Sequence, residues 1–341
     1  MSFDIKHFNF MSLYRNILKQ ALNITWRYKY LWLFGLFASL LGSGGEYKII
    51  NNISSGNTGK NILPNFASLS ETGVFNKETL NNLVQLFKTD MTSMIIILAV
   101  GLIVLAIAAV LIWLMIISQA TLVNDSGAII NGKKKKNNIK ASFIAGKKKF
   151  WPVLGLNIII KIVIGLIFIL ISLPIILAAT KAISSLAVYS YIILFILFIP
   201  IAITLSFITK YAIAYVVIKG QTAIESIKSG WELFTKNWLV SIEMAFILFF
   251  INFLIGLGAI LLIFILAIPF IFLALVLYQL TTFMAFWLTI ITMAIIFIAI
   301  IILSGTLLTT FQTVAWTGLF LELINKGGKS KIIRLAEKLK K

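Results

Sequence analysis

Four polar side chains interrupt otherwise apolar stretches of this 341-residue chain: Asn157, Lys161, Lys210 and Glu243. A charge at the centre of a bilayer costs about 3 kcal/mol or more, so such residues face the interior of a helix bundle, pair, or reach toward water. One interpretation is a polar cleft that faces the cytoplasm, in which the two lysines attract an anionic group such as a lipid phosphate. The alternative is structural: Lys210 extends to the membrane surface, and Lys161 or Lys210 pairs with Glu243 to hold spans together.

Lysine clusters and tryptophans flank these apolar stretches. Lysines near an anionic membrane surface contribute about 1 kcal/mol each, and tryptophan favours the membrane–water boundary. We therefore predict an anionic-lipid surface, with the alternative that the lysines only fix the orientation of the chain. The surface comprises Lys133, Lys134, Lys135, Lys136, Lys147, Lys148 and Lys149, and the predicted interfacial anchors are Trp26, Trp32, Trp151, Trp231 and Trp238.

The residues needed for common catalytic sites are scarce. The single histidine is His7, there is no cysteine, and of eleven acidic residues only Glu243 lies clearly within an apolar stretch. These facts argue against a histidine base, a thiolate or histidine metal site and a pair of carboxylates within the membrane. Ser206 and Lys210 are one helical turn apart, which leaves a serine–lysine pair as the one catalytic spacing. We expect no enzyme activity, no cofactor and no metal.

The composition indicates a membrane protein. Hydrophobic residues make up 60% of the chain and charged residues only 12%, with a mean hydropathy of +1.02. A soluble domain cannot bury that fraction of apolar side chains. The net charge of +19 comes from lysines and arginines in short segments beside apolar runs. The positive-inside rule accounts for them, and nucleic acid is not an expected partner.

We predict one polytopic membrane domain over residues 1–341, with an all-α fold of six transmembrane helices. A span needs about 20 apolar residues. Residues 244–321 contain no charged side chain and could cross three times. Two crossings keep the basic tail, residues 323–341, on the same side as the basic loop, residues 124–150; a re-entrant segment near Pro269 is the alternative. The predicted spans are residues 24–43, 92–119, 152–178, 187–218, 239–277 and 283–318.

Charge asymmetry sets the predicted orientation. Residues 124–150 carry eight lysines against Asp125, whereas residues 44–90 balance four lysines against four acidic residues. Cytoplasmic loops carry the excess of lysine and arginine, so we place both termini in the cytoplasm and residues 44–90 outside the inner membrane. The first span is short in strongly apolar residues, and a signal peptide is its alternative.

A basic, aromatic segment precedes an apolar stretch three times. These segments are ITWRYKYLW from residue 24, IKASFIAGKKKFW from residue 139 and IKSGWELFTKNW from residue 227. Each precedes two predicted spans, which suggests three transmembrane hairpins, each entered by an amphipathic cytoplasmic helix. The alternative is convergence, since every junction of cytoplasm and membrane attracts these residue types.

Residues 209–241, TKYAIAYVVIKGQTAIESIKSGWELFTKNWLVS, resemble a group of little-characterised bacterial six-span membrane proteins. This group includes the membrane domain attached to glycerophosphodiester phosphodiesterases. The segments ALNITWRYKYLWLFGLFASL and FQTVAWTGLFLELI resemble the first span and last helix of that group. The resemblance implies a membrane-embedded accessory or lipid-related role; the catalytic domain is missing here, and no catalytic residue can be carried over.

Together these features predict a non-enzymatic inner-membrane protein that organises the membrane or binds a lipid or other amphiphile through the cytoplasm-facing cleft. The expected partners are membrane lipids with anionic headgroups. The alternative is a transporter of small solutes or lipids, which needs polar residues that continue to the outer face. An intramembrane enzyme is the third hypothesis.

Overall fold

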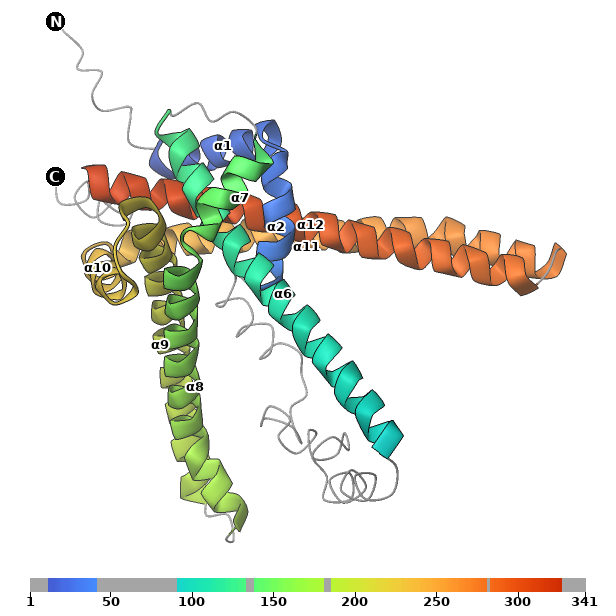
Figure 1. Ribbon diagram of the computed structural model, residues 1–341, viewed down its shortest axis with the longest axis horizontal. Coiled ribbons are helices and arrows are strands. Elements are labelled where there is room, and N and C mark those ends of the chain that lie inside the picture. The colour runs from blue at the N-terminus through green and yellow to red at the C-terminus, as the bar shows by residue number, and fades with distance from the viewer. Residues whose placement is uncertain (1–11, 42–90, 133–137, 181–184, 281–282, 327–341) are drawn as a thin grey trace, which may run out of the picture. The chain divides into compact units, whose positions relative to one another are not determined.

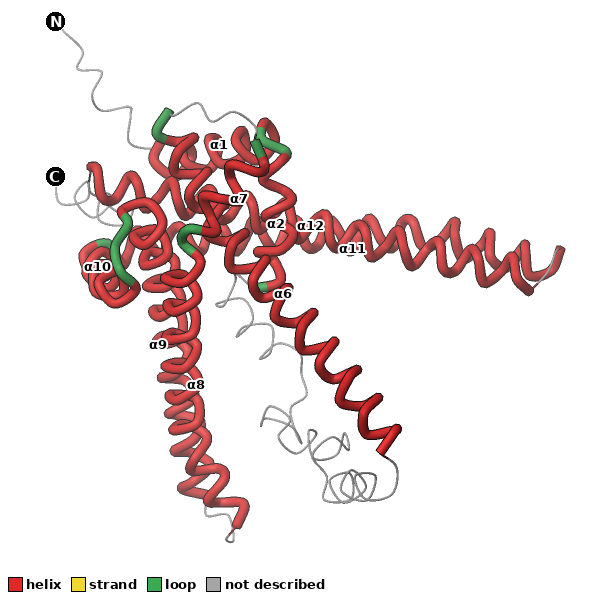
Figure 2. The backbone as a smooth tube through the Cα atoms, in the orientation of Figure 1, coloured by secondary structure: helices red, strands yellow, loops and turns green. Residues whose placement is uncertain are grey.

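All regular structure in the described residues is helical (Figure 2). The computed structural model describes residues 12–41, 91–132, 138–180, 185–280 and 283–326. The prediction of an all-α chain is confirmed for this part. Contacts divide the chain into two compact units. Unit 1 comprises Met1–Ser43, Met115–Ile160 and Leu205–Lys341, and unit 2 comprises Gly44–Leu114 and Lys161–Thr204.

Five of the described helices are long and apolar enough to cross a membrane, which makes the chain a multi-pass membrane protein by length and composition. They overlap the second to sixth predicted spans. They are α6 (Met91–Ile130), α8 (Phe150–Thr180), α9 (Ser185–Ala214) with its π-helical continuation η2 (Tyr215–Lys219), α11 (Trp238–Leu280) and α12 (Phe283–Lys326).

The first predicted span is divided into two helices. Helix α1 (Ser12–Arg27) ends before helix α2 (Tyr30–Leu40) begins. The Trp32 indole N–H donates to the Thr25 carbonyl at 2.8 Å across the break, and this bond closes the turn. The 11 residues of α2 measure about 16 Å, roughly half the thickness of the hydrocarbon layer. The described helices therefore leave a sixth span as a proposal.

Residues 244–321 fold as two long helices. Helix α11 runs without a break through Pro269, and α11 and α12 lie side by side (Figure 1). The described part of this stretch contains no interruption of the kind that a re-entrant segment needs, and the two crossings stay a prediction. Residues 281–282, at the predicted polar tip, lie outside the described residues.

Two further short helices each lie directly before a long helix in the chain. Helix α7 (Ile139–Lys147) starts at Asn138, whose side chain accepts a hydrogen bond from the Ala141 amide. Helix α10 (Ala223–Lys236) starts with a capping box, in which Thr222 and Glu225 satisfy each other's backbone amides. These caps fix where each helix begins, just before α8 and α11.

The core of unit 1 is formed by three segments that we call the tails: residues 115–130 of α6, 205–219 of α9 and η2, and 306–326 of α12. The tails meet at Gly127, where an added Cβ would lie 3.0 Å from Ile218 and 3.8 Å from Thr317. Ile117, Tyr211 and Phe320 are among the largest fully buried side chains. The sequence makes these contacts possible because small residues alternate with large apolar ones along each tail.

Two of the three entry helices, α7 and α10, pack on the tail of the long helix that precedes them in the chain. An added Cβ at Gly146 of α7 would lie 2.7 Å from the Ile117 carbonyl oxygen of α6, and one at Gly230 of α10 would lie 3.1 Å from the Ile208 carbonyl oxygen of α9. Helix α1 contacts α12, and a Cβ added at Gly318 would lie 3.3 Å from Ile17 Cγ2. The third contact joins the first entry helix to the last tail and closes a ring.

Unit 2 contains a smaller apolar contact between α8 and α9. Phe198 and Ala202 of α9 are buried, and Ile164, Ile167 and Leu194 pack against them. This contact joins the two helices along the part of α8 and α9 that the sequence predicts to lie within the membrane.

Candidate functional site

The predicted cleft residue Glu243 is half-buried on α11 and accepts a hydrogen bond from Tyr14. The distance from the Tyr14 hydroxyl to Glu243 Oε2 is 2.5 Å. Tyr14 lies on α1, so the contact ties the first entry helix to the start of α11. A hydrogen bond to a carboxylate is among the stronger ones in proteins. This contact gives Glu243 a tyrosine partner, and the pairing with Lys161 or Lys210 stays a prediction.

Lys210 is half-buried on α9 beside two aromatic rings. Its ammonium lies 4.4 Å from the ring centroid of Trp316 and 5.8 Å from that of Phe207. A cation over the face of an aromatic ring is attracted by the ring's quadrupole, and the attraction increases when the cation is desolvated. The rings therefore hold the ammonium at the edge of unit 1.

The aromatic rings around Lys210 belong to a packed cluster. Phe207 stacks on Phe234 of α10 at 5.5 Å, and Tyr211 meets Trp316 edge-on at 6.3 Å. The buried Tyr211 hydroxyl shares a hydrogen bond of 2.7 Å with Ser241 of α11. These contacts join α9, α10, α11 and α12, so the position of Lys210 is set by four helices.

Asn157 and Lys161 lie in different surroundings. The Asn157 amide donates to Gln119 Oε1 at 3.0 Å and to the Val153 carbonyl at 2.9 Å, and so links α8 to α6. Lys161 is exposed and belongs to unit 2, whereas Asn157, Lys210 and Glu243 belong to unit 1. The cleft therefore stays a prediction.

Asp125 is a buried carboxylate that the sequence did not single out. It was expected in the basic cytoplasmic loop, residues 124–150, but α6 continues through it to Ile130, and Asp125 is fully buried. It accepts hydrogen bonds from the hydroxyls of Tyr30 at 3.0 Å and Ser142 at 2.5 Å, and from the Asn124 amide at 3.0 Å. Burial of a charge is tolerated when donors surround it.

The Asp125 contacts join α2, α6 and α7. The carboxylate is out of reach of a substrate because it is fully buried, and its oxygens are engaged by neighbouring donors. The described residues contain no group of three or more histidine, cysteine or acidic side chains that could hold a metal. Asp125 thus acts as an anchor of the fold. The one signal in the sequence is the run of small and polar residues around it, from Ser118 to Ser126, which extends the apolar helix.

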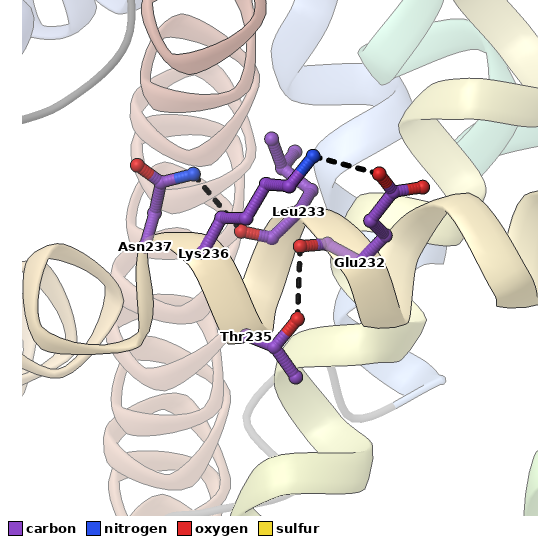
Figure 3. Close-up of polar contacts among 5 residues, drawn as sticks. All are labelled: Glu232, Leu233, Thr235, Lys236 and Asn237. Atoms are coloured by element: carbon purple, nitrogen blue, oxygen red, sulfur yellow. Dashed lines mark hydrogen bonds and ion pairs between the residues drawn. The ribbon is translucent and has the colours of Figure 1, made fainter.

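The junction of α10 and α11 is closed by short-range polar contacts (Figure 3). Lys236 Nζ lies 2.7 Å from Glu232 Oε1, and the Asn237 amide donates to the Leu233 carbonyl at 3.0 Å. The hydrogen bond between the two charged side chains lowers the pKa of Glu232 and raises the pKa of Lys236. Both side chains are exposed to solvent, so the ion pair lies on the surface of α10, outside the buried core.

The predicted surface residues are described only in part. Lys133–Lys136 lie outside the described residues, whereas Lys147 and Lys148 are exposed and Lys149 is half-buried. The predicted tryptophan anchors Trp26, Trp151, Trp231 and Trp238 are exposed, and Trp32 is partly buried. The side chains that the structure describes are thus placed where a membrane surface could reach them.

Comparison of the chain with protein-family models, curated proteins and solved structures finds no match in any of the three. The class that the fold defines is a multi-pass, all-helical membrane protein. The resemblance to bacterial six-span membrane proteins therefore still rests on the sequence segments quoted above.

Proposed function

We propose that the protein is a non-enzymatic protein of the inner membrane that binds an anionic lipid or another anionic amphiphile at the cytoplasmic ends of its helices. The observation that supports this proposal is Lys210, a half-buried cation held against Trp316 in a chain segment with no other charge between residues 182 and 218. Electrostatic attraction is stronger where water is excluded, so a phosphate or carboxylate next to this ammonium would be stabilised.

The membrane level of Lys210 follows from the exposed apolar surface. On α11, the exposed stripe of Trp238, Ile242, Phe246 and Phe250 repeats every four residues from the first residue of the helix. Hydrocarbon contact thus begins near Trp238, and Glu243 lies about 7.5 Å further in. Because Tyr211 bonds to Ser241, we propose a similar depth for the neighbouring Lys210, near the headgroups.

The orientation in this proposal comes from the positive-inside rule. Helices α1 and α7 contain basic residues and no acidic ones, and both lie in unit 1 with the tails. We place unit 1 and both termini on the cytoplasmic side. Within this arrangement, the chain has six spans in three hairpins, and the first hairpin includes α2 and residues that the structure does not describe.

The two other hypotheses have less support. A transporter needs polar side chains along a route to the outer face, yet in α6, α11 and α12 the residues expected in the outer half, such as 95–112 and 283–303, carry no charge. An intramembrane enzyme needs reacting groups that meet, and two of the described acidic residues, Asp125 and Glu243, engage tyrosine hydroxyls on different helices.

The proposal is tested by native mass spectrometry of the purified protein with its bound lipids. Lys210→Met removes the charge and keeps the length of the side chain. We expect this variant to lose the co-purifying anionic lipid. Lys219→Met is the matched control, because Lys219 is exposed at the end of η2. If Lys210→Met folds with the parent's melting temperature and keeps the same bound lipids, the proposal is wrong.

A further inference from the structure

The three entry helices share one arrangement of buried residues. In each, two residues four apart face the tail on which the helix packs, and we call them the inner pair. All six residues are buried. The inner pairs are Ile17 and Ala21 of α1, Ser142 and Gly146 of α7, and Ser226 and Gly230 of α10.

The opposite face repeats as well. The residues two and five positions after the first residue of each inner pair both have exposed side chains. We call these two residues the outer pair. The outer pairs are Lys19 and Leu22 of α1, Ile144 and Lys147 of α7, and Lys228 and Trp231 of α10. Every outer pair thus combines one lysine with one large apolar side chain, although the order differs. Residues three apart share one side of a helix, so the two act together.

Exposed apolar residues beside lysines are typical of helices that lie in a membrane surface. Leu22, Ile144 and Trp231 are 51%, 46% and 53% exposed. The placement along the chain agrees with this chemistry, because apolar helices α2, α8 and α11 begin directly after the three entry helices. The outer pairs therefore sit where the headgroup layer of the membrane begins.

The charge of these helices favours an anionic surface. Helices α1 and α7 contain no acidic residue. On α10, Glu225 accepts a hydrogen bond from the Thr222 amide, and Glu232 pairs with Lys236. The lysines of the outer pairs, together with the absence of acid from α1 and α7, give these two helices a positive outer face that complements lipid phosphates, whereas on α10 two glutamates balance two lysines.

We infer that the three outer pairs form an interaction surface for the anionic lipids of the membrane in which the protein is embedded. Each apolar member enters the boundary of the acyl chains, and each lysine contacts a headgroup phosphate. The contact presses the inner pairs onto the tails and so fixes the ring of entry helices at the membrane surface. This surface is separate from Lys210, which lies on α9.

The test uses the absence of cysteine from the chain. A single Ile224→Cys, on the same face of α10 as Lys228 and Trp231, carries an environment-sensitive fluorophore in the full-length protein. Quenching by lipids with a quencher on the acyl chain then reports how often the face is immersed. We expect stronger quenching in vesicles that contain phosphatidylglycerol than in vesicles of phosphatidylcholine alone.

The matched variants are Lys228→Gln, in the outer pair, and Lys236→Gln, an exposed lysine of the same helix. Lys228→Gln is expected to lower the ratio of immersed to free label about fivefold in anionic vesicles, the effect of one lysine at an anionic surface. Lys236→Gln is expected to leave it unchanged. Equal quenching with and without phosphatidylglycerol, or an equal effect of the two α10 variants, would overturn the inference.

A second pair of variants covers a failure of the first to fold. The label is placed at Ile144 of α7, and Lys147→Gln is compared with Lys148→Gln, which is exposed but outside the outer pair. Loss of quenching only with Lys147→Gln supports the inference, and the same loss with both contradicts it.

Discussion

Replacing Gly146 by alanine should loosen the contact of α7 with α6. The new Cβ would lie 2.7 Å from the Ile117 carbonyl oxygen, and it would also meet the Thr121 hydroxyl. Carbon and oxygen ordinarily meet at about 3.3 Å or more, so the helices must separate by roughly half an ångström. The Thr121 side chain can rotate, but the backbone oxygen cannot move away from its helix.

Two effects of opposite sign set the size of the change. Alanine favours a helix over glycine by about 0.8–1.0 kcal/mol, whereas overpacking of a close contact costs about 1–3 kcal/mol. We expect a net loss of up to about 2 kcal/mol. Gly155→Ala is the control, because nothing lies within 4 Å of its added Cβ, and it should stabilise the protein. Gly230→Ala, with its nearest contact at 3.1 Å, should fall between the two.

The assay is equilibrium unfolding in mixed detergent and dodecyl sulfate micelles, followed by circular dichroism. The order of stability should be Gly155→Ala, then Gly230→Ala, then Gly146→Ala. If Gly146→Ala is as stable as Gly155→Ala, then α7 does not pack on α6 as described, and the ring of entry helices loses one of its three contacts.

Three further predictions concern the polar contacts and the topology. Asp125→Ala should cost about 2–4 kcal/mol of unfolding free energy and Tyr30→Phe about 1 kcal/mol. The loss in the double variant should be less than the sum of the two, because both substitutions remove the same hydrogen bond. Since the folded pKa of Glu232 is lowered and that of Lys236 is raised, their pair stabilises the protein from above about pH 4 to about pH 10; the small destabilisation by Glu232→Gln at pH 7, measured as a shift in melting temperature, should therefore vanish as the pH falls below about 4. A single cysteine at Thr281 should react with an impermeant reagent from outside the cell, and labelling from the cytoplasm would contradict two crossings by α11 and α12.

The sequence predicts the long helices well because an uninterrupted apolar run has few alternatives to a helix. It predicts poorly where helices begin and end in unit 1. Asp125 was assigned to a loop because a charged residue after an apolar run usually marks where the chain leaves the membrane. Only the folded structure shows that Tyr30 and Ser142 donate hydrogen bonds to it. The break between α1 and α2 was missed for a related reason: aromatic and basic residues suit both a continuous interfacial helix and a turn closed by Trp32.

The inner pairs also bear on whether the three entries are a true repeat. Convergence explains tryptophan and lysine at each junction, since the membrane surface selects those residues wherever a chain enters it. It does not explain why the buried face of each entry helix places two residues, four apart, against a tail. Gly146 and Gly230 meet backbone atoms of α6 and α9, and both glycines are buried. Because the membrane cannot select a buried contact between two helices, this shared geometry favours repetition of one structural unit.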